Sequence, residues 1–227
     1  MPPGAVDSSS IRSRFDPSLY LIADPTATGG RPLEEVVAAA VAGGVTLVQL
    51  RDKLATTRDF LERALRLKAL LRPHGVPLIV NDRIDVMLAA EADGVHVGHE
   101  DMPVDLARRL IGPERILGVT LREEGQARAA DPAIADYAGV GPVRATMTKA
   151  NALAPRGVEG FAAFRRFVPL RTVAIGGIVP ALAAPLLAAG ADGIAVAAAI
   201  AGAPDPAAAA RRFAAAIAEA RGRSHPT

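Results

Sequence analysis

The tetrapeptide Ala191-Asp192-Gly193-Ile194 opens a short apolar run near the end of the chain, and related tetrapeptides occur at two earlier positions. These are Ala92-Asp93-Gly94-Val95 and Ala135-Asp136-Tyr137-Ala138, and a looser relative is the Ala-Gly-Gly that precedes Val45. Each tetrapeptide lies directly before, or at the beginning of, an expected β-strand. A helix–turn–strand unit that recurs in this way indicates a fold built from repeated β/α units.

Short, almost wholly apolar segments alternate along the chain with longer segments rich in alanine and leucine. The apolar segments have the composition of strands covered on both faces. Strands are expected at Leu19–Ala23, Thr46–Leu50, Leu78–Val80, Gly94–Val97, Ile116–Val119, Tyr137–Val140, Thr172–Ile175 and Gly193–Val196. Helices are expected between them, for example at Leu33–Ala42, Arg58–Leu71, Val104–Leu110, Pro180–Ala189 and Pro206–Ala220. Strict alternation favours a parallel sheet and eight strands favour closure, so the sequence predicts an α/β protein with a (β/α)8 TIM barrel as its single domain.

The barrel is expected to span residues 18–221 of the 227. Residues 1–17 contain several Pro, Gly and Ser residues and are expected to form a disordered arm, and residues 222–227 a frayed tail. The start lacks the apolar region of a secretory signal, and no apolar run reaches the roughly 18 residues that span a bilayer. A cytoplasmic protein that does not contact membranes is therefore expected.

The composition excludes several classes of function. The chain has no cysteine, so disulfides, thiolate zinc sites and cysteine nucleophiles are ruled out. The formal charge is only +2, no block of Lys and Arg dominates a segment, and Trp is absent. Nucleic acid is therefore not an expected partner. The sequence leaves open whether the chain forms a homo-oligomer.

In a barrel of this type, catalytic and binding residues lie on the loops that follow the strands. Polar residues directly after a strand are therefore candidates, and polar residues before a strand are expected to be structural. At the end of the second strand and directly after it come Gln49, Arg51 and Lys53, which could hold a polyanion or form a solvated loop with an Arg–Asp pair.

Carboxylates follow the third and fourth strands. Asn81-Asp82 and Asp101 could cap the helices that come next, or the two carboxylates could meet over adjacent strand ends. Two carboxylates without a thiolate or a histidine cluster suit a hard cation such as Mg²⁺. His96 lies inside an expected strand and His74 lies in a turn, and both are interpreted as structural.

The last three loops have the character of phosphate sites. A long segment from Gly141 carries Thr146, Thr148 and Lys149, whose hydroxyl and ammonium groups can contact phosphate oxygens. Gly176-Gly177 ends the seventh strand, and residues 193–200 run from the eighth strand into an expected short helix. Free N–H groups at such a helix favour an anion, although the glycines alone would also fit tight turns.

Taken in order, these motifs resemble the thiamine phosphate synthase family over nearly the whole chain, from Leu19 to about Ala220. The order of five motifs is the specific part: Gln49–Lys53, Asn81-Asp82, Gly98–Asp101, Gly141–Lys149 and Gly176-Gly177. The family is a group of transferases that join 4-amino-2-methyl-5-(diphosphooxymethyl)pyrimidine to 4-methyl-5-(2-phosphooxyethyl)thiazole. The products are thiamine phosphate and pyrophosphate.

The resemblance implies a role for each matching residue, with small phosphorylated heterocycles as the binding partners. The residues implied to hold the pyrimidine diphosphate are Gln49, Arg51, Lys53, Asn81, Thr120 and Lys149. Of these, Arg51, Lys53 and Lys149 are implied to be catalytic. Asp82 and Asp101 are implied to bind Mg²⁺. The residues implied to hold the thiazole phosphate are Thr146, Thr148, Gly177, Ala197 and Ala198.

The sequence departs from the family pattern at four places. Thr120 stands where the family usually has serine, and Leu121-Arg122 replaces a small or apolar residue followed by histidine. Arg144-Ala145 replaces Phe-Pro, and Ala198 replaces a serine at the thiazole phosphate. The change at Ala198 removes a hydroxyl donor and leaves the backbone N–H in place.

Two alternative functions remain at this stage. A related barrel that aromatises a thiazole carboxylate phosphate, a metal-independent tautomerase, would share the fold and the phosphate loops. The presence of Lys53, Asp82, Asp101 and Lys149 argues against it, because these are the residues expected to handle a diphosphate. A non-catalytic sensor of phosphorylated ligands is the second alternative, and the altered Arg144-Ala145 and Ala198 would be its evidence.

Overall fold

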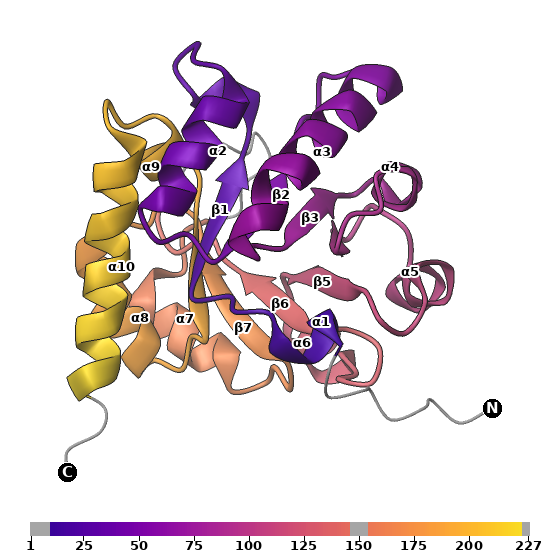
Figure 1. Cartoon of the computed structure of the whole chain (residues 1–227). Helices are drawn as coiled ribbons and strands as arrows, with labels where there is room; N and C mark the ends of the chain where they lie inside the picture. The colour runs from indigo at the N-terminus through magenta and orange to yellow at the C-terminus, as the bar shows by residue number, and fades with distance from the viewer. Residues whose placement is uncertain (1–9, 146–153, 224–227) are drawn as a thin grey trace.

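The computed structural model describes residues 10–145 and 154–223 of the chain. Eight parallel strands form a closed barrel in chain order, in which the last strand pairs with the first. The strands are β1 (Leu19–Ala23), β2 (Leu47–Leu50), β3 (Leu78–Asn81), β4 (Gly94–Val97), β5 (Ile116–Leu121), β6 (Tyr137–Val140), β7 (Arg171–Ile175) and β8 (Gly193–Val196). The predicted (β/α)8 barrel is confirmed (Figure 1).

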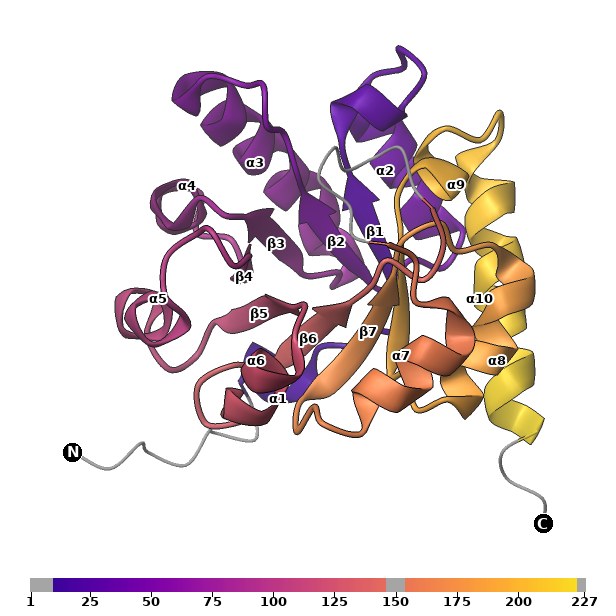
Figure 2. The same ribbon diagram turned by 180° about the vertical axis from the view of Figure 1, so that it is seen from behind.

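Helices surround the barrel and connect successive strands (Figures 1 and 2). The longer ones are α2 (Leu33–Ala42), α3 (Thr57–Leu71), α5 (Val104–Ile111), α7 (Gly157–Arg165) and α10 (Pro206–Arg223). The shorter ones are α1 (Ile11–Arg14), α4 (Ile84–Ala89), α6 (Glu124–Ala129), α8 (Ala183–Ala188) and α9 (Ala198–Ala201). Three 3-10 turns are η1 (Pro25–Ala27), η2 (Arg72–His74) and η3 (Pro180–Leu182). No helix of the described residues has the length and apolar character to cross a membrane.

The expected helix at Pro180–Ala189 is divided into η3 and α8. Pro185 has no backbone N–H, and it is tolerated because α8 begins at Ala183, which leaves Pro185 in the first helical turn. At the other end of the chain, α10 continues to Arg223, so it extends past the expected end of the barrel at residue 221. It packs on α2 and α8 and so covers the seam where β8 meets β1.

The recurring tetrapeptides have one structural role, which is to join consecutive strands in pairs. In each, the aspartate side chain accepts a hydrogen bond from a backbone N–H at the start of the preceding strand, at 2.7–2.8 Å. The aspartate N–H donates back to a carbonyl of the same strand residue. After the related Ala-Gly-Gly segment, the Thr46 hydroxyl takes the place of the aspartate and accepts from the Leu19 N–H at 3.1 Å. These four clamps are Leu19 with Thr46, Leu78 with Asp93, Leu117 with Asp136, and Thr172 with Asp192.

Helix α1 closes the end of the barrel from which the strands start, and it lies beside α6 in both views (Figures 1 and 2). The Arg12 guanidinium is buried, pairs with Asp136 and donates to the Ala133 carbonyl at 2.9 Å. The Phe15 ring lies 5.7 Å from the Tyr137 ring, and the Arg171 guanidinium stacks on the Phe15 ring at 3.9 Å from its centroid. The expectation of a disordered arm is therefore wrong for residues 10–17, because the apolar and cationic side chains there find buried partners. Residues 1–9 and 224–227 lie outside the described part.

Apolar side chains fill the barrel interior above this closure. The interior cluster consists of Phe15, Tyr20, Ile22, Leu47, Ile79, Ile116, Tyr137, Val173 and Ala195. A separate, larger apolar layer lies between the strands and the helices. Because both faces of each strand are buried, the strand segments are apolar without alternation.

Candidate functional site

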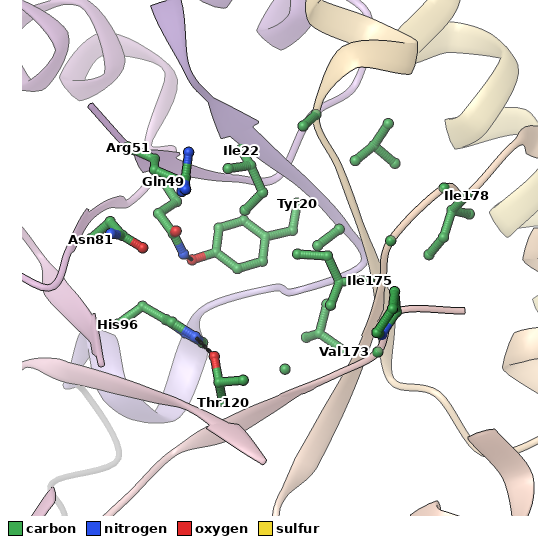
Figure 3. A pocket seen from close by; sticks show the side chains of 18 of the residues that line it. Tyr20, Ile22, Gln49, Arg51, Asn81, His96, Thr120, Val173, Ile175 and Ile178 are labelled. Atoms are coloured by element: carbon green, nitrogen blue, oxygen red, sulfur yellow. Dashed lines mark hydrogen bonds between the residues drawn. The ribbon is translucent and has the colours of Figure 1, made fainter. Parts of the chain in front are cut away.

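A pocket of about 210 Å³ opens at the carboxyl ends of the strands, and every strand or its following loop contributes to its wall. The pocket lies opposite the end that α1 closes. Seven of the predicted site residues line it: Gln49, Arg51, Asn81, Thr120, Gly177, Ala197 and Ala198. Figure 3 shows how four of these residues, Gln49, Arg51, Asn81 and Thr120, lie around it. Thr146, Thr148 and Lys149 lie outside the described residues.

The guanidinium of Arg51 reaches the pocket from the end of β2 and is held by Asp24 at the end of β1. Asp24 is 2% exposed, and its carboxylate also accepts from the backbone N–H and the hydroxyl of Thr26, at 2.9 and 2.6 Å. The buried aspartate therefore fixes where the cation stands. Asp24 directly follows a strand, so the rule that singled out Gln49 and Arg51 would also have found it.

Asp82 and Asp101 meet at the ends of β3 and β4. Burial raises the pKa of Asp101, and the adjacent Asp82 carboxylate raises it further. Neither residue caps a helix: α4 and α5 begin after Arg83 and Pro103, and neither helix has a side-chain cap. The cap interpretation is therefore wrong. Asp101 instead accepts from the Gly98 N–H at 2.7 Å.

Asp82 is in the left-handed backbone region, with φ of 61°, which is uncommon for a residue other than glycine. The backbone there is held by a hydrogen bond from the Asp82 N–H to the His96 carbonyl, at 2.9 Å. The Asp82 carboxylate pairs with the Lys53 ammonium, so Lys53 stands beside the carboxylate pair and does not line the pocket. Two carboxylates and one ammonium group therefore stand together at the ends of β3 and β4.

On the other side of the pocket, β7 ends in Gly176 and Gly177, with φ of 98° and 62°. A Cβ at Gly176 would lie 2.6 Å from the Cβ of Pro142, and one at Gly177 would lie 2.7 Å from the Ala145 carbonyl oxygen. The two glycines are therefore required both by conformation and by the close approach of the loop after β6.

The short helix expected after the eighth strand is present as α9, and it begins at Ala198 directly after Ala197. Neither residue offers a side-chain cap, and both line the pocket. Because Ala198 has only a methyl group, the contacts available here to a ligand oxygen are backbone N–H groups.

Three polar residues on the floor of the pocket were not predicted from the sequence. Tyr20, His96 and Tyr137 lie within strands and point into the barrel, where they form the polar floor of the pocket. His96 was interpreted as structural, yet its ring contacts both Tyr137 and Thr120. His74 lies in η2, away from the pocket.

Comparison with known proteins identifies relatives along most of the chain. The family model of thiamine monophosphate synthase matches residues 19–200. A thiamine-phosphate synthase of Albidiferax ferrireducens is 54% identical over 196 residues, which are 86% of this chain and 89% of the relative. One of Chloroflexus aurantiacus is 52% identical over 204 residues, covering 90% of this chain and 94% of the relative. A solved thiamine phosphate pyrophosphorylase from Pyrococcus furiosus superposes with a TM-score of 0.82 at 36% identity, over 92% of this chain and 98% of that one.

Proposed function

This chain belongs to the thiamine monophosphate synthase family, and we propose that it joins an aminopyrimidine methyl diphosphate to a thiazole ethyl phosphate. The products are thiamine phosphate and pyrophosphate, so the chain is a transferase of thiamine biosynthesis. The observation that supports this assignment most directly is the sequence identity to thiamine-phosphate synthases. About half of the aligned residues are identical, and the alignments cover nearly the full length of these relatives. We propose that the reaction takes place in the cytoplasm.

The pyrimidine diphosphate is proposed to lie over β2 to β5. Gln49, Asn81 and Thr120 would hold the ring with polar groups, and Arg51 would contact the diphosphate oxygens. Because Asp24 fixes Arg51 before the ligand arrives, little ordering is needed on binding. Lys53 and Lys149 are proposed to stabilise the charge that grows on the departing diphosphate.

The thiazole phosphate is proposed to lie under the loops after β7 and β8. Gly177 and the backbone at Ala197-Ala198 would hold its phosphate group, together with Thr146 and Thr148. The pyrimidine is electron-rich, so it can carry the positive charge left on its methylene when diphosphate leaves. The thiazole nitrogen then attacks that carbon, and no protein nucleophile is needed.

Asp82 and Asp101 fit a Mg²⁺ ion, and we propose that they hold one. Burial, and then contact with the Asp82 carboxylate, raises the pKa of Asp101, and a divalent cation between the two carboxylates would relieve their repulsion. No cluster of three or more acidic or histidine ligands exists among the described residues, so water and diphosphate oxygens would complete the coordination. The ion would supply positive charge to the leaving diphosphate.

The test is an assay with both substrates and Mg²⁺ that measures thiamine phosphate. We expect turnover with Mg²⁺, no turnover in EDTA, and recovery when Mg²⁺ returns. Asp82→Asn and Asp101→Asn should each abolish most turnover while thiazole phosphate binding, measured by calorimetry, stays near the wild-type value. Asp85→Asn is a matched control, because this exposed carboxylate pairs with Arg83 outside the pocket.

Each opposite outcome has a defined meaning. Full activity in EDTA, or normal turnover by both Asn variants, would refute the role of the metal. Thiazole phosphate binding with no product from folded protein would favour the sensor over the synthase. Aromatisation of a thiazole carboxylate phosphate, with no joining reaction, would favour the tautomerase.

A further inference from the structure

Four consecutive hydrogen bonds run through the barrel interior and connect Gln49 with Thr120. Figure 3 shows the two end links, between Gln49 and Tyr20 and between His96 and Thr120. Gln49 Nε2 donates to Tyr20 Oη at 2.7 Å, and Tyr20 Oη lies 2.7 Å from Tyr137 Oη. His96 Nδ1 lies 3.0 Å from Tyr137 Oη, and His96 Nε2 lies 2.9 Å from Thr120 Oγ1. We call these five residues the relay. Its two ends, Gln49 and Thr120, both line the pocket.

The positions of the protons decide which group donates and which accepts in each hydrogen bond of the relay. Burial raises the pKa of Tyr20 and Tyr137, so each hydroxyl keeps its single proton near neutral pH. With the Gln49 amide nitrogen donating to Tyr20, the arrangement that uses every hydroxyl proton within the relay has Tyr20 donating to Tyr137 and Tyr137 donating to His96 Nδ1. A neutral imidazole then has its N–H at Nε2, and this group donates to Thr120 Oγ1.

At the end of the relay, Thr120 accepts from His96, so its own hydroxyl proton is available to a group in the pocket. At the other end, the Gln49 amide nitrogen is engaged by Tyr20, so its carbonyl oxygen is the group available to the pocket. The relay thus makes the two ends opposite in polarity, with an acceptor at Gln49 and a donor at Thr120.

The backbone leaves room for this path at one glycine of β5. A Cβ on Gly118 would lie 2.3 Å from Tyr137 Oη and 2.5 Å from His96 Nδ1. A larger residue at this position would displace the central link of the relay. The relay therefore requires glycine at position 118, where a side chain would occupy the space of the Tyr137 hydroxyl and the His96 ring.

We propose that Tyr137, together with Tyr20 and His96, is a positioning residue that fixes Thr120 as a hydrogen-bond donor opposite the acceptor at Gln49. A ring with an amino group beside a ring nitrogen has the matching donor and acceptor, and an aminopyrimidine is such a ring. The inference rests on the proposed function. It adds three residues to those that determine substrate specificity, and none of the three needs to touch the substrate.

The experiment measures equilibrium binding of each substrate separately by calorimetry. In Tyr137→Phe, the ring stays and the relay is cut, so the Kd for the pyrimidine diphosphate should rise about tenfold while the Kd for thiazole phosphate stays unchanged. Tyr20→Phe cuts a different link and should give a similar rise. Phe15→Leu is the packing control, because Phe15 contacts the Tyr137 ring and is not part of the relay. It should leave both Kd values unchanged.

A mutant cycle with Thr120→Val separates the relay from a general packing effect. If Tyr137 acts through Thr120, adding Tyr137→Phe to Thr120→Val should change the pyrimidine diphosphate Kd less than twofold. The same tenfold loss in both backgrounds, or an equal loss of both ligands, would overturn the inference. So would unchanged binding in Tyr137→Phe. If the wild-type chain binds no pyrimidine diphosphate, the proposed function itself fails and the inference fails with it.

Discussion

Replacing Asp136 by asparagine tests whether polar residues placed before strands serve stability alone. The Asp136 carboxylate is 6% exposed and accepts from three donors, which are Arg12, Arg108 at 2.8 Å and the Leu117 N–H at 2.7 Å. The substitution keeps the shape and one acceptor oxygen but leaves two buried guanidinium groups without a counter-charge. Burial already lowers the pKa of Arg108, and Asp136 opposes that shift.

The burial of these groups sets the expected loss in the free energy of unfolding. Removing one partner of a buried ion pair costs about 3–5 kcal/mol, and the oxygen that Asn retains places the loss near the lower limit, about 3 kcal/mol. For a domain of this size, each kcal/mol shifts the Tm by roughly 2–4 °C, so the Tm should fall by roughly 6–12 °C. The kcat/KM for thiamine phosphate formation, measured well below the Tm, should not change, because Asp136 lies at the end opposite the pocket.

Chemical denaturation and thermal melting provide the measurement, and Glu124→Gln is the control. Glu124 pairs with Arg128 at 2.7 Å on the surface, where the two side chains are 53% and 60% exposed. An exposed pair of this kind contributes roughly 0.5 kcal/mol or less. If Asp136→Asn loses no more unfolding free energy than Glu124→Gln, the argument from burial is wrong. A lowered kcat/KM at full stability would show instead that this end of the barrel influences the reaction.

Three further predictions concern the pocket. Ala198→Ser should restore a hydroxyl donor worth roughly 1.5–3 kcal/mol to a charged phosphate and lower the thiazole phosphate KM about 10–150-fold; an unchanged KM would mean that another group already makes the contact. Lys149→Ala should lower kcat on the order of 100-fold in steady-state kinetics, and a normal kcat with a raised thiazole KM would assign the lysine to the other substrate. Asp24→Asn should weaken the positioning of Arg51 and raise the pyrimidine diphosphate KM about tenfold, with the thiazole KM unchanged as internal control.

The strand and helix pattern could be predicted because strands buried on both faces are short, apolar and separated by helix-length segments. The bounds of β1, β4, β6 and β8 agree with the sequence expectation, and β5 extends two residues further, to Leu121. Thr120 therefore lies inside β5 and not after it. The fold could be derived from one sequence because eight repetitions of one local pattern point to the same architecture.

The pocket floor could not be predicted in the same way. Whether a strand residue such as Tyr20 or His96 faces the interior or the helices depends on the register between strands, and segments that are apolar on both faces carry no alternation that reveals it. The Lys53–Asp82 pair was also missed, since its members are 29 residues apart and meet only because β2 and β3 are neighbours.

The four clamps also bear on the order in which the barrel assembles. The sequence separations that they close are 27, 15, 19 and 20 residues. Closing loops of this length costs less entropy than joining β8 to β1 across the whole chain. Each clamp therefore allows a strand, a helix and the next strand to associate as a local unit early in folding. On this view the barrel grows from four strand pairs, and the seam covered by α10 is among the last contacts to form.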